Sequence, residues 1–268
     1  MFDNEATQFF YEITPERILT AVEELGVRCT GKIIPLNSVE NRVYDVELDI
    51  PKEDLQSKYQ ASRVIKFYRP GRWSKEQILE EHQFIRDLEE RDLPVVSPLN
   101  FLDGTSVRSV PGLANDLYFS IFPKIGGRIL DEYTDAQIAM LGRFIARMHQ
   151  VGRSEKAKHR NVLTTQSYGL DNCKYLLEKQ ILPPEIQNRY IQLVEQICET
   201  SAPWFETVPL QRLHGDCHLG NILWIDEACT FVDFDDFIMG PPIQDLWLIV
   251  PGRDEWSVKQ RNLLIDSY

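Results

Sequence analysis

Two apolar, strand-like runs near the end of the chain are interrupted by polar and ionisable residues, and this pattern constrains the fold most. Residues 213–224 read LHGDCHLGNILW, and residues 231–236 read FVDFDD. Burying such groups beside a core costs about 2–7 kcal/mol for a neutral polar group, and more for a charge, unless a partner satisfies them. We therefore expect the apolar residues of these segments to pack in a core and their aspartates to contact a bound ligand.

Three residues in these runs have a spacing typical of phosphoryl transfer. Asp216 precedes Asn221 by five residues, the interval between base and metal-binding asparagine in a kinase catalytic loop. Asp233 follows twelve residues later, and a short hairpin would return it beside Asn221. Amide and carboxylate oxygens suit Mg²⁺. We predict that Asp216 is the catalytic base, that Asn221 and Asp233 bind magnesium, that Asp233 is also catalytic, and that ATP is the phosphoryl donor.

The same region also contains histidines and cysteines that suggest a zinc site, namely His214, Cys217, His218 and Cys229. Their spacing fits no zinc motif, and it leaves Asp216 unexplained. The phosphoryl-transfer interpretation is therefore favoured. We expect His214 to brace the loop and Asp245 to be a buried brace that accepts backbone N–H groups.

A lysine and a glutamate upstream fit the same chemistry. Lys66 lies in the run VIKF, which follows the V-A-I-K pattern of a phosphate-binding strand. Glu80 and Glu81 are the candidate partners on the next helix, and Glu81 is preferred because it shares the inward face with Ile85. The polar loop at 36–42 lacks a glycine motif, yet its backbone N–H groups and the side chains of Ser38 and Asn41 could cradle phosphate.

The order of predicted elements indicates an α+β fold with two lobes. Apolar alternation and turn residues predict strands near 31–36, 43–48, 62–68, 99–102 and 117–122. Capping boxes at Ser74/Gln77 and Thr134/Gln137 predict helix starts. We predict an N-lobe at 1–123, which clamps the nucleotide phosphates, and a mainly helical C-lobe at 124–268, which carries the catalytic loop, the metal site and the substrate site.

Charge and composition narrow the cellular setting. The formal net charge is −12, which disfavours binding to nucleic acid. The five cysteines form no C-x-x-C pair, so we expect free thiols in a reducing compartment. The longest strongly apolar run, 246–250, is too short to span a membrane, and no signal peptide is evident. We predict a cytoplasmic, monomeric protein.

At this point a family resemblance is evident. The motif H-G-D-x-H-x-x-N at 214–221, followed by V-D-F-D-D at 232–236, resembles the aminoglycoside phosphotransferase and choline kinase superfamily. The whole chain resembles the bacterial stress response kinase A family within it, most strongly in the stretches LNSVENRVYDVE, RVIKFYRPGRWSKEQILEEHQFIRDL, LHGDCHLGNILW and FVDFDDFIMGPPIQDLW. That resemblance implies a protein-kinase-like fold, magnesium and ATP, phosphorylation of serine or threonine in proteins including itself, and a role in stress.

Two features leave alternatives open. The segment LLIDSY at 263–268 reads as an unfinished amphipathic helix, so we expect an incomplete C-lobe in which five apolar residues lack partners, namely Ile249, Val250, Leu263, Leu264 and Ile265. The motif chemistry also suits a small-molecule kinase acting on an amino alcohol or an aminoglycoside. A nucleotide-binding pseudokinase is the remaining alternative, and the intact set of Lys66 and Asp216 with the predicted metal ligands argues against it.

Overall fold

Two compact units make up the structure, a computed structural model that describes residues 9–111 and 117–268. The units are unit 1, Met1–Leu130 with Ile222–Val232, and unit 2, Asp131–Asn221 with Asp233–Tyr268. The predicted α+β architecture is confirmed, since one unit contains an antiparallel sheet and the other is mainly helical. The lobe boundary at residue 123 stays a prediction, and the compact units differ from it, because 124–130 and the segment 222–232 belong to unit 1.

Unit 1 is built on a five-stranded antiparallel sheet with the order β1-β2-β3-β5-β4. Its strands are β1 (Cys29–Leu36), β2 (Arg42–Leu48), β3 (Ser62–Phe67), β4 (Arg108–Ser109) and β5 (Tyr118–Pro123). The strand predicted near 99–102 is wrong. That segment ends in a turn where Gly104 N donates to Phe101 O, and Leu99 N makes a single bond to Ile121 O at 2.7 Å.

A helix that precedes the sheet, α2 (Pro15–Glu23), packs against one sheet face. The Thr14 side chain caps it, and proline stands at its first position. Ile18 and Val22 of α2 join Ile65 and Phe119 of the sheet in one buried apolar cluster. This core fixes the strand that carries Lys66.

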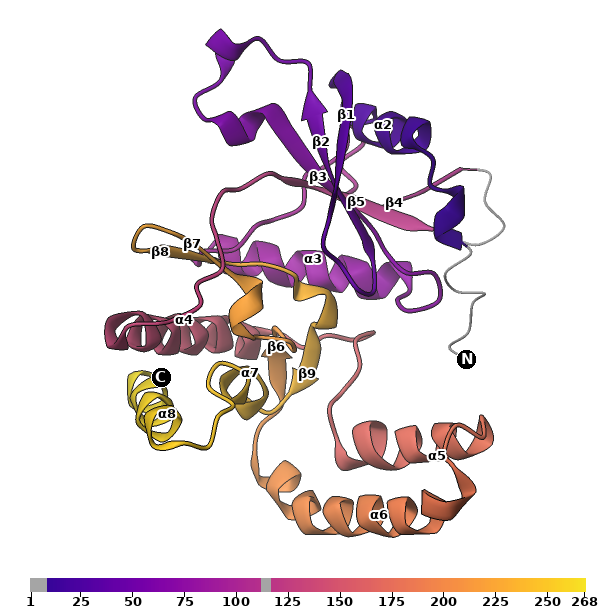
Figure 1. The fold of residues 1–268 in the computed structure, drawn as a ribbon, viewed down its shortest axis with the longest axis vertical. Helices are drawn as coiled ribbons and strands as arrows, with labels where there is room; N and C mark the ends of the chain where they lie inside the picture. The colour runs from indigo at the N-terminus through magenta and orange to yellow at the C-terminus, as the bar shows by residue number, and fades with distance from the viewer. Residues whose placement is uncertain (1–8, 112–116) are drawn as a thin grey trace. The chain divides into compact units, whose positions relative to one another are not determined.

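The long helix of unit 1 is α3 (Lys75–Glu89), which begins with the predicted capping box of Ser74 and Gln77 (Figure 1). Unit 1 also contains the hairpin of β7 (Ile222–Ile225) and β8 (Ala228–Phe231). Phe231 N donates to Pro94 O at 2.8 Å, so the hairpin is hydrogen-bonded to the segment that follows α3. Short helical turns complete the unit: η1 (Phe9–Glu12), η2 (Lys52–Asp54) and η3 (Lys58–Ala61).

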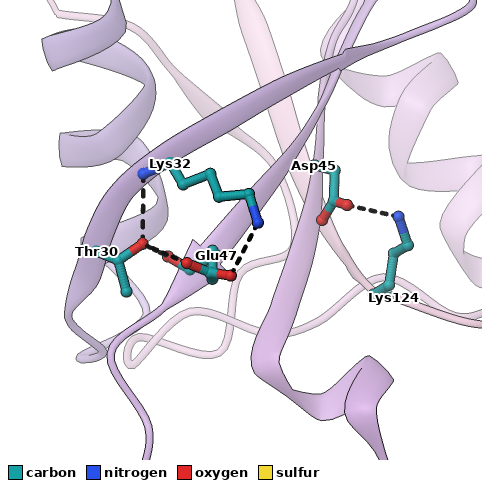
Figure 2. Close-up of polar contacts among 5 residues, drawn as sticks. All are labelled: Thr30, Lys32, Asp45, Glu47 and Lys124. Atoms are coloured by element: carbon teal, nitrogen blue, oxygen red, sulfur yellow. Dashed lines mark hydrogen bonds and ion pairs between the residues drawn. The ribbon is translucent and has the colours of Figure 1, made fainter.

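Polar cross-strand contacts hold β1 against β2 (Figure 2). Thr30 Oγ1 donates to Glu47 Oε2 at 3.0 Å, and Lys32 Nζ lies 3.2 Å from Glu47 Oε1. Lys124, which directly follows β5, reaches Asp45 of β2 with an Nζ–Oδ2 distance of 2.6 Å. The ion pair therefore connects β2 to the segment that leaves the sheet.

Unit 2 contains five α-helices and a two-stranded sheet among its described residues. The helices are α4 (Asp135–Ser154), α5 (Asp171–Glu178), α6 (Pro184–Thr207), α7 (Ile243–Trp247) and α8 (Glu255–Ser267). The strands are β6 (Gln211–Leu213) and β9 (Ile238–Gly240), with helical turns η4 (Gln166–Leu170), η5 (Leu219–Asn221) and η6 (Phe234–Asp236). The capping box at Thr134 and Gln137 starts α4, as predicted.

The last helix, α8, packs closely on α4 (Figure 1). A Cβ at Gly142 of α4 would lie 2.6 Å from the Leu264 carbonyl oxygen, so glycine is what allows this approach. Ile249, Val250 and Leu264 are 1%, 4% and 0% exposed, so the expectation that they lack partners is wrong, whereas Leu263 is half-buried and Ile265 is exposed. Leu264 is buried because its own helix, α8, packs against α4. No helix in the described part of the chain is long and apolar enough to cross a membrane.

Candidate functional site

The loop that follows β6 brings two of the predicted site residues together. Asn221 Nδ2 donates to the Asp216 backbone oxygen at 2.9 Å and lies 3.3 Å from Asp216 Oδ2. His218 Nε2 also lies 3.4 Å from that carboxylate oxygen, and the Asp216 side chain is 41% exposed. Because Nδ2 of Asn221 donates to the Asp216 backbone, Oδ1 is the atom of this side chain that could accept or ligate. Asp216 therefore presents an accessible carboxylate from a fixed loop.

A glycine directly before Asp216 permits the sharp turn of this loop. Gly215 has φ +88°, which favours glycine over other residues. A Cβ there would lie 1.9 Å from the Asp236 carbonyl oxygen, which is backbone and cannot move aside cheaply. Glycine is therefore required for the direction in which Asp216 leaves β6.

Asn221 directly precedes β7, and Asp233 lies two residues after the end of β8. The hairpin pairs Ile222 with Phe231, so its two strands begin and end at one open end. Asp233 is exposed and has φ 63° and ψ 66°, a left-handed conformation that is uncommon outside glycine. Strain of this kind gathers at functional positions. The expected return of Asp233 toward Asn221 agrees with this hairpin register.

Asp245 is a fully buried brace for the loop, as the sequence predicts. Its Oδ2 accepts the His214 backbone N–H at 2.9 Å, and its Oδ1 accepts that of Gly215 at 2.8 Å. Burial by itself raises the pKa of Asp245. The hydrogen bond and charge of His149, with smaller effects of His214 and the Gly215 N–H, outweigh burial and hold the pKa below its ordinary value. The brace is therefore a carboxylate.

Sequence reasoning missed two members of this brace, His149 and Tyr268. His149 Nε2 lies 3.0 Å from Asp245 Oδ2, and its Nδ1 lies 2.7 Å from the Tyr268 hydroxyl. Because the carboxylate can only accept, Nε2 carries a proton. The sequence did contain one indication that His149 is buried, because it lies four residues after Ile145 on the apolar face of the helix.

The lysine and glutamate predicted to act together are paired within unit 1. Lys66 Nζ of β3 lies 3.9 Å from Glu81 Oε1 of α3, and the side chains are 8% and 1% exposed. Glu81 lies on the buried face of α3, beside Ile78 and Ile85. Burial of both charges makes the pair interdependent, because either charge alone would be poorly solvated.

The two loop residues predicted to cradle phosphate make contacts inside their own unit. Ser38 Oγ accepts the Asn41 backbone N–H at 3.3 Å, and Asn41 Oδ1 accepts the Arg69 backbone N–H at 3.1 Å. Glu40 lies 2.8 Å from Arg69 and 3.3 Å from Arg72. Both arginines are thus paired with a carboxylate of the 37–41 loop, and sequence reasoning had no signal for this pairing.

The predicted magnesium ligands can be compared with the other possible metal-binding side chains. Within residues 9–111 and 117–268, no three histidine, cysteine, aspartate or glutamate side chains gather in a way that could hold a metal. His214, one residue of the zinc alternative, packs against the Phe234 ring at 4.3 Å between centroids. Asn221 and Asp233 supply an amide and a carboxylate oxygen, a donor set that fits Mg²⁺.

Comparison with known proteins connects these features to one family. The model of the phosphotransferase enzyme family matches residues 32–268. Stress response kinase A of Escherichia coli is 35% identical over 266 residues, which cover 99% of this chain and 76% of that protein. A relative from Salmonella typhimurium named serine/threonine protein kinase RdoA is 34% identical and covers 100% of this chain and 77% of its own length.

A solved structure shares the fold. Amicoumacin kinase hAmiN, in complex with AMP-PNP, Ca²⁺ and amicoumacin, matches with a TM-score of 0.76 at 18% identity, covering 100% of this chain and 80% of that one. The predicted protein-kinase-like fold and the predicted resemblance to stress response kinase A are both confirmed. The chain therefore belongs to the phosphotransferase enzyme family, and the stress response kinase A proteins are among its relatives.

Proposed function

We propose that this phosphotransferase uses magnesium and ATP to phosphorylate serine and threonine hydroxyls in proteins, including its own, as part of a bacterial stress response. Asp216 accepts the hydroxyl proton while the hydroxyl oxygen bonds to the γ-phosphorus. The bond from that phosphorus to the bridging oxygen breaks, and ADP leaves. Positioning and charge stabilisation supply most of the rate in such reactions.

The remaining site residues have supporting roles in this proposal. Lys66, held by Glu81, binds the ATP phosphates, and the loop containing Ser38 and Asn41 covers them. Asn221 and Asp233 hold magnesium, which would neutralise charge on the phosphates. Since the side chain of Asn41 accepts the Arg69 N–H, its contribution would come from shaping the loop and from its backbone.

The arrangement of Asp216 carries the proposal. An exposed carboxylate rarely needs a rigid loop, yet both peptide N–H groups just before Asp216 are bound by the buried Asp245. A glycine that tolerates no side chain precedes it as well. A general base requires a carboxylate whose orientation is fixed in this way, because the base must lie within hydrogen-bond reach of the proton that it removes from the substrate.

The choice of a protein substrate rests on the relatives, one of which is named a serine/threonine protein kinase. A second candidate is a small-molecule kinase. Only eleven residues separate Asp233 from Asp245, which leaves little platform for a peptide, and the structural neighbour described above is named an amicoumacin kinase.

The deciding experiment is incubation of the purified chain with labelled ATP and magnesium. It is run alone, with a generic acceptor protein, and with choline, an aminoglycoside and an amino alcohol. We expect phosphoserine or phosphothreonine, mapped by mass spectrometry, and none in Asp216→Asn. Efficient turnover of a small alcohol without any protein phosphorylation would establish the second candidate. Binding of ATP without turnover of any acceptor would identify a pseudokinase.

A further inference from the structure

A buried chain of hydrogen bonds in unit 1 lies next to the lysine–glutamate pair. The Tyr68 hydroxyl is 3.1 Å from His82 Nε2, and His82 Nδ1 is 2.9 Å from Ser106 Oγ. The three residues are 1%, 0% and 2% exposed. Buried polar groups that lose their hydrogen-bond partners destabilise the folded state, so these hydrogen bonds should persist in the folded protein.

The chain joins three separate parts of unit 1. Tyr68 directly follows β3, His82 lies in the second turn of α3, and Ser106 precedes β4. A hydroxyl can donate or accept, so both contacts of the His82 ring are satisfied whichever nitrogen carries the proton. These hydrogen bonds therefore restrict the rotation of α3 about its own axis relative to the end of β3.

The Tyr68–His82 contact lies close to the predicted phosphate-binding pair of Lys66 and Glu81. Glu81 adjoins His82 on the buried face of α3. Lys66 and Tyr68 are two residues apart, and the Lys66 Nζ lies 4.9 Å from the centroid of the Tyr68 ring. A cation over an aromatic face is stabilised electrostatically, more so when it is desolvated. Lys66 thus has the Glu81 carboxylate and the Tyr68 ring as neighbours.

We infer that Tyr68 and His82 are positioning residues for Lys66. Their hydrogen bond, extended to Ser106, holds α3 in the rotation that brings Glu81 to Lys66, and the Tyr68 ring supports the ammonium group. This inference rests on the proposed function, in which Lys66 binds the ATP phosphates. Neither residue touches the nucleotide in this proposal, and both act through Lys66.

A purely structural role is the competing explanation. Tyr68 packs in an apolar cluster with Ile78 and Val107, and the His82 ring lies edge-on to Phe122 at 6.1 Å. Removing the Tyr68 hydroxyl would then lower stability without any specific effect on Lys66. The two explanations differ in whether the effect of the hydroxyl on ATP binding depends on the presence of Lys66.

A double-mutant cycle separates them. Affinity for magnesium–ATP is measured by titration calorimetry for the wild type, Tyr68→Phe, Lys66→Met and the double variant. Tyr44→Phe is the matched control, since Tyr44 is a partly buried tyrosine of the same sheet that packs edge-on against Phe67. We expect Tyr68→Phe to weaken binding by about tenfold in the wild-type background and by less than about twofold with Lys66→Met, because contacting residues couple. Tyr44→Phe should bind like the wild type.

The outcomes are distinguishable. Wild-type affinity in Tyr68→Phe, or an equal loss of affinity in both backgrounds, would overturn the inference. If Tyr68→Phe does not fold, Ser106→Ala takes its place in the same cycle, because it breaks the far end of the chain and keeps the tyrosine. Equal binding by wild type and Lys66→Met would instead reject the role of Lys66 in the proposed function itself.

Discussion

The two groups of site residues are positioned by different means. In unit 1, Lys66 and Glu81 are both buried, and their neighbours hold them through side-chain contacts. In unit 2, the Asp216 side chain is 41% exposed, and Asp245 fixes the backbone that precedes it. A buried pair is sensitive to the loss of either charge, whereas an exposed base on a braced loop is sensitive to the brace. The comparison predicts distinct phenotypes for the two units.

The largest effect is expected at the exposed base. Asp216→Asn keeps the size of the side chain and removes the proton acceptor, so phosphotransfer should fall by roughly 10²–10⁴-fold. Nucleotide affinity and melting temperature should remain close to those of the wild type. Steady-state rates and calorimetry would measure both. The control is Asp226→Asn, an exposed turn residue with φ 50°, a conformation that asparagine tolerates. Near-normal turnover by Asp216→Asn would remove it from the mechanism.

The brace should affect both stability and rate. Asp245→Asn leaves one acceptor oxygen where two now accept, so a buried N–H loses its partner, and we expect a loss of about 3 kcal/mol in the free energy of unfolding. Because folding lowers the pKa of Asp245, its stabilisation is fully present above the ordinary value of about 4. It is lost as pH falls through the lower, folded-state pKa.

Urea denaturation between pH 7 and pH 3 tests this sign. The difference between the wild type and Asp245→Asn should be constant at neutral pH and should shrink in the acid range. A difference that grows as pH falls would contradict the assignment of a carboxylate at this position. The corresponding change to the exposed Asp171, Asp171→Asn, serves as a control with little expected effect.

A third prediction tests the buried pair against its neighbour in sequence. Glu81→Gln should raise the KM for ATP by about tenfold, because Lys66 loses its charged partner in a buried place. Glu80→Gln should change it by less than about twofold. Kinetics at fixed acceptor concentration would separate the two variants. If Glu80→Gln has the larger effect, Glu81 is not the functional partner of Lys66.

The smallest effect is expected at the partly exposed ion pair of unit 1. Lys124→Met removes the contact with Asp45 shown in Figure 2, where the side chains are 25% and 14% exposed. We expect a loss of about 1 kcal/mol or less in the free energy of unfolding. Added salt should reduce the difference from the wild type, since it screens such pairs. A larger loss that is independent of salt would mean that this pair behaves like the buried one.

The sequence alone determined the local features of this protein. Helix starts at Ser74 and Thr134 were predictable because a capping box involves residues three apart. The spacing of Asp216, Asn221 and Asp233 was readable because a loop and a short hairpin are themselves local structures. Lys66 was readable from its strand pattern for the same reason.

Tertiary structure decided the contacts between residues distant in sequence. His149 and Asp245 are 96 residues apart, and only the packing of α4 and α7 against the loop brings them together. The helix pattern favoured Glu81 over Glu80, but only the packing of α3 on the sheet shows that Glu81 Oε1 lies 3.9 Å from Lys66 Nζ. Periodicity reveals which face of an element is buried, but not what that face meets. Partners at long range depend on how whole elements pack, and no local pattern encodes that.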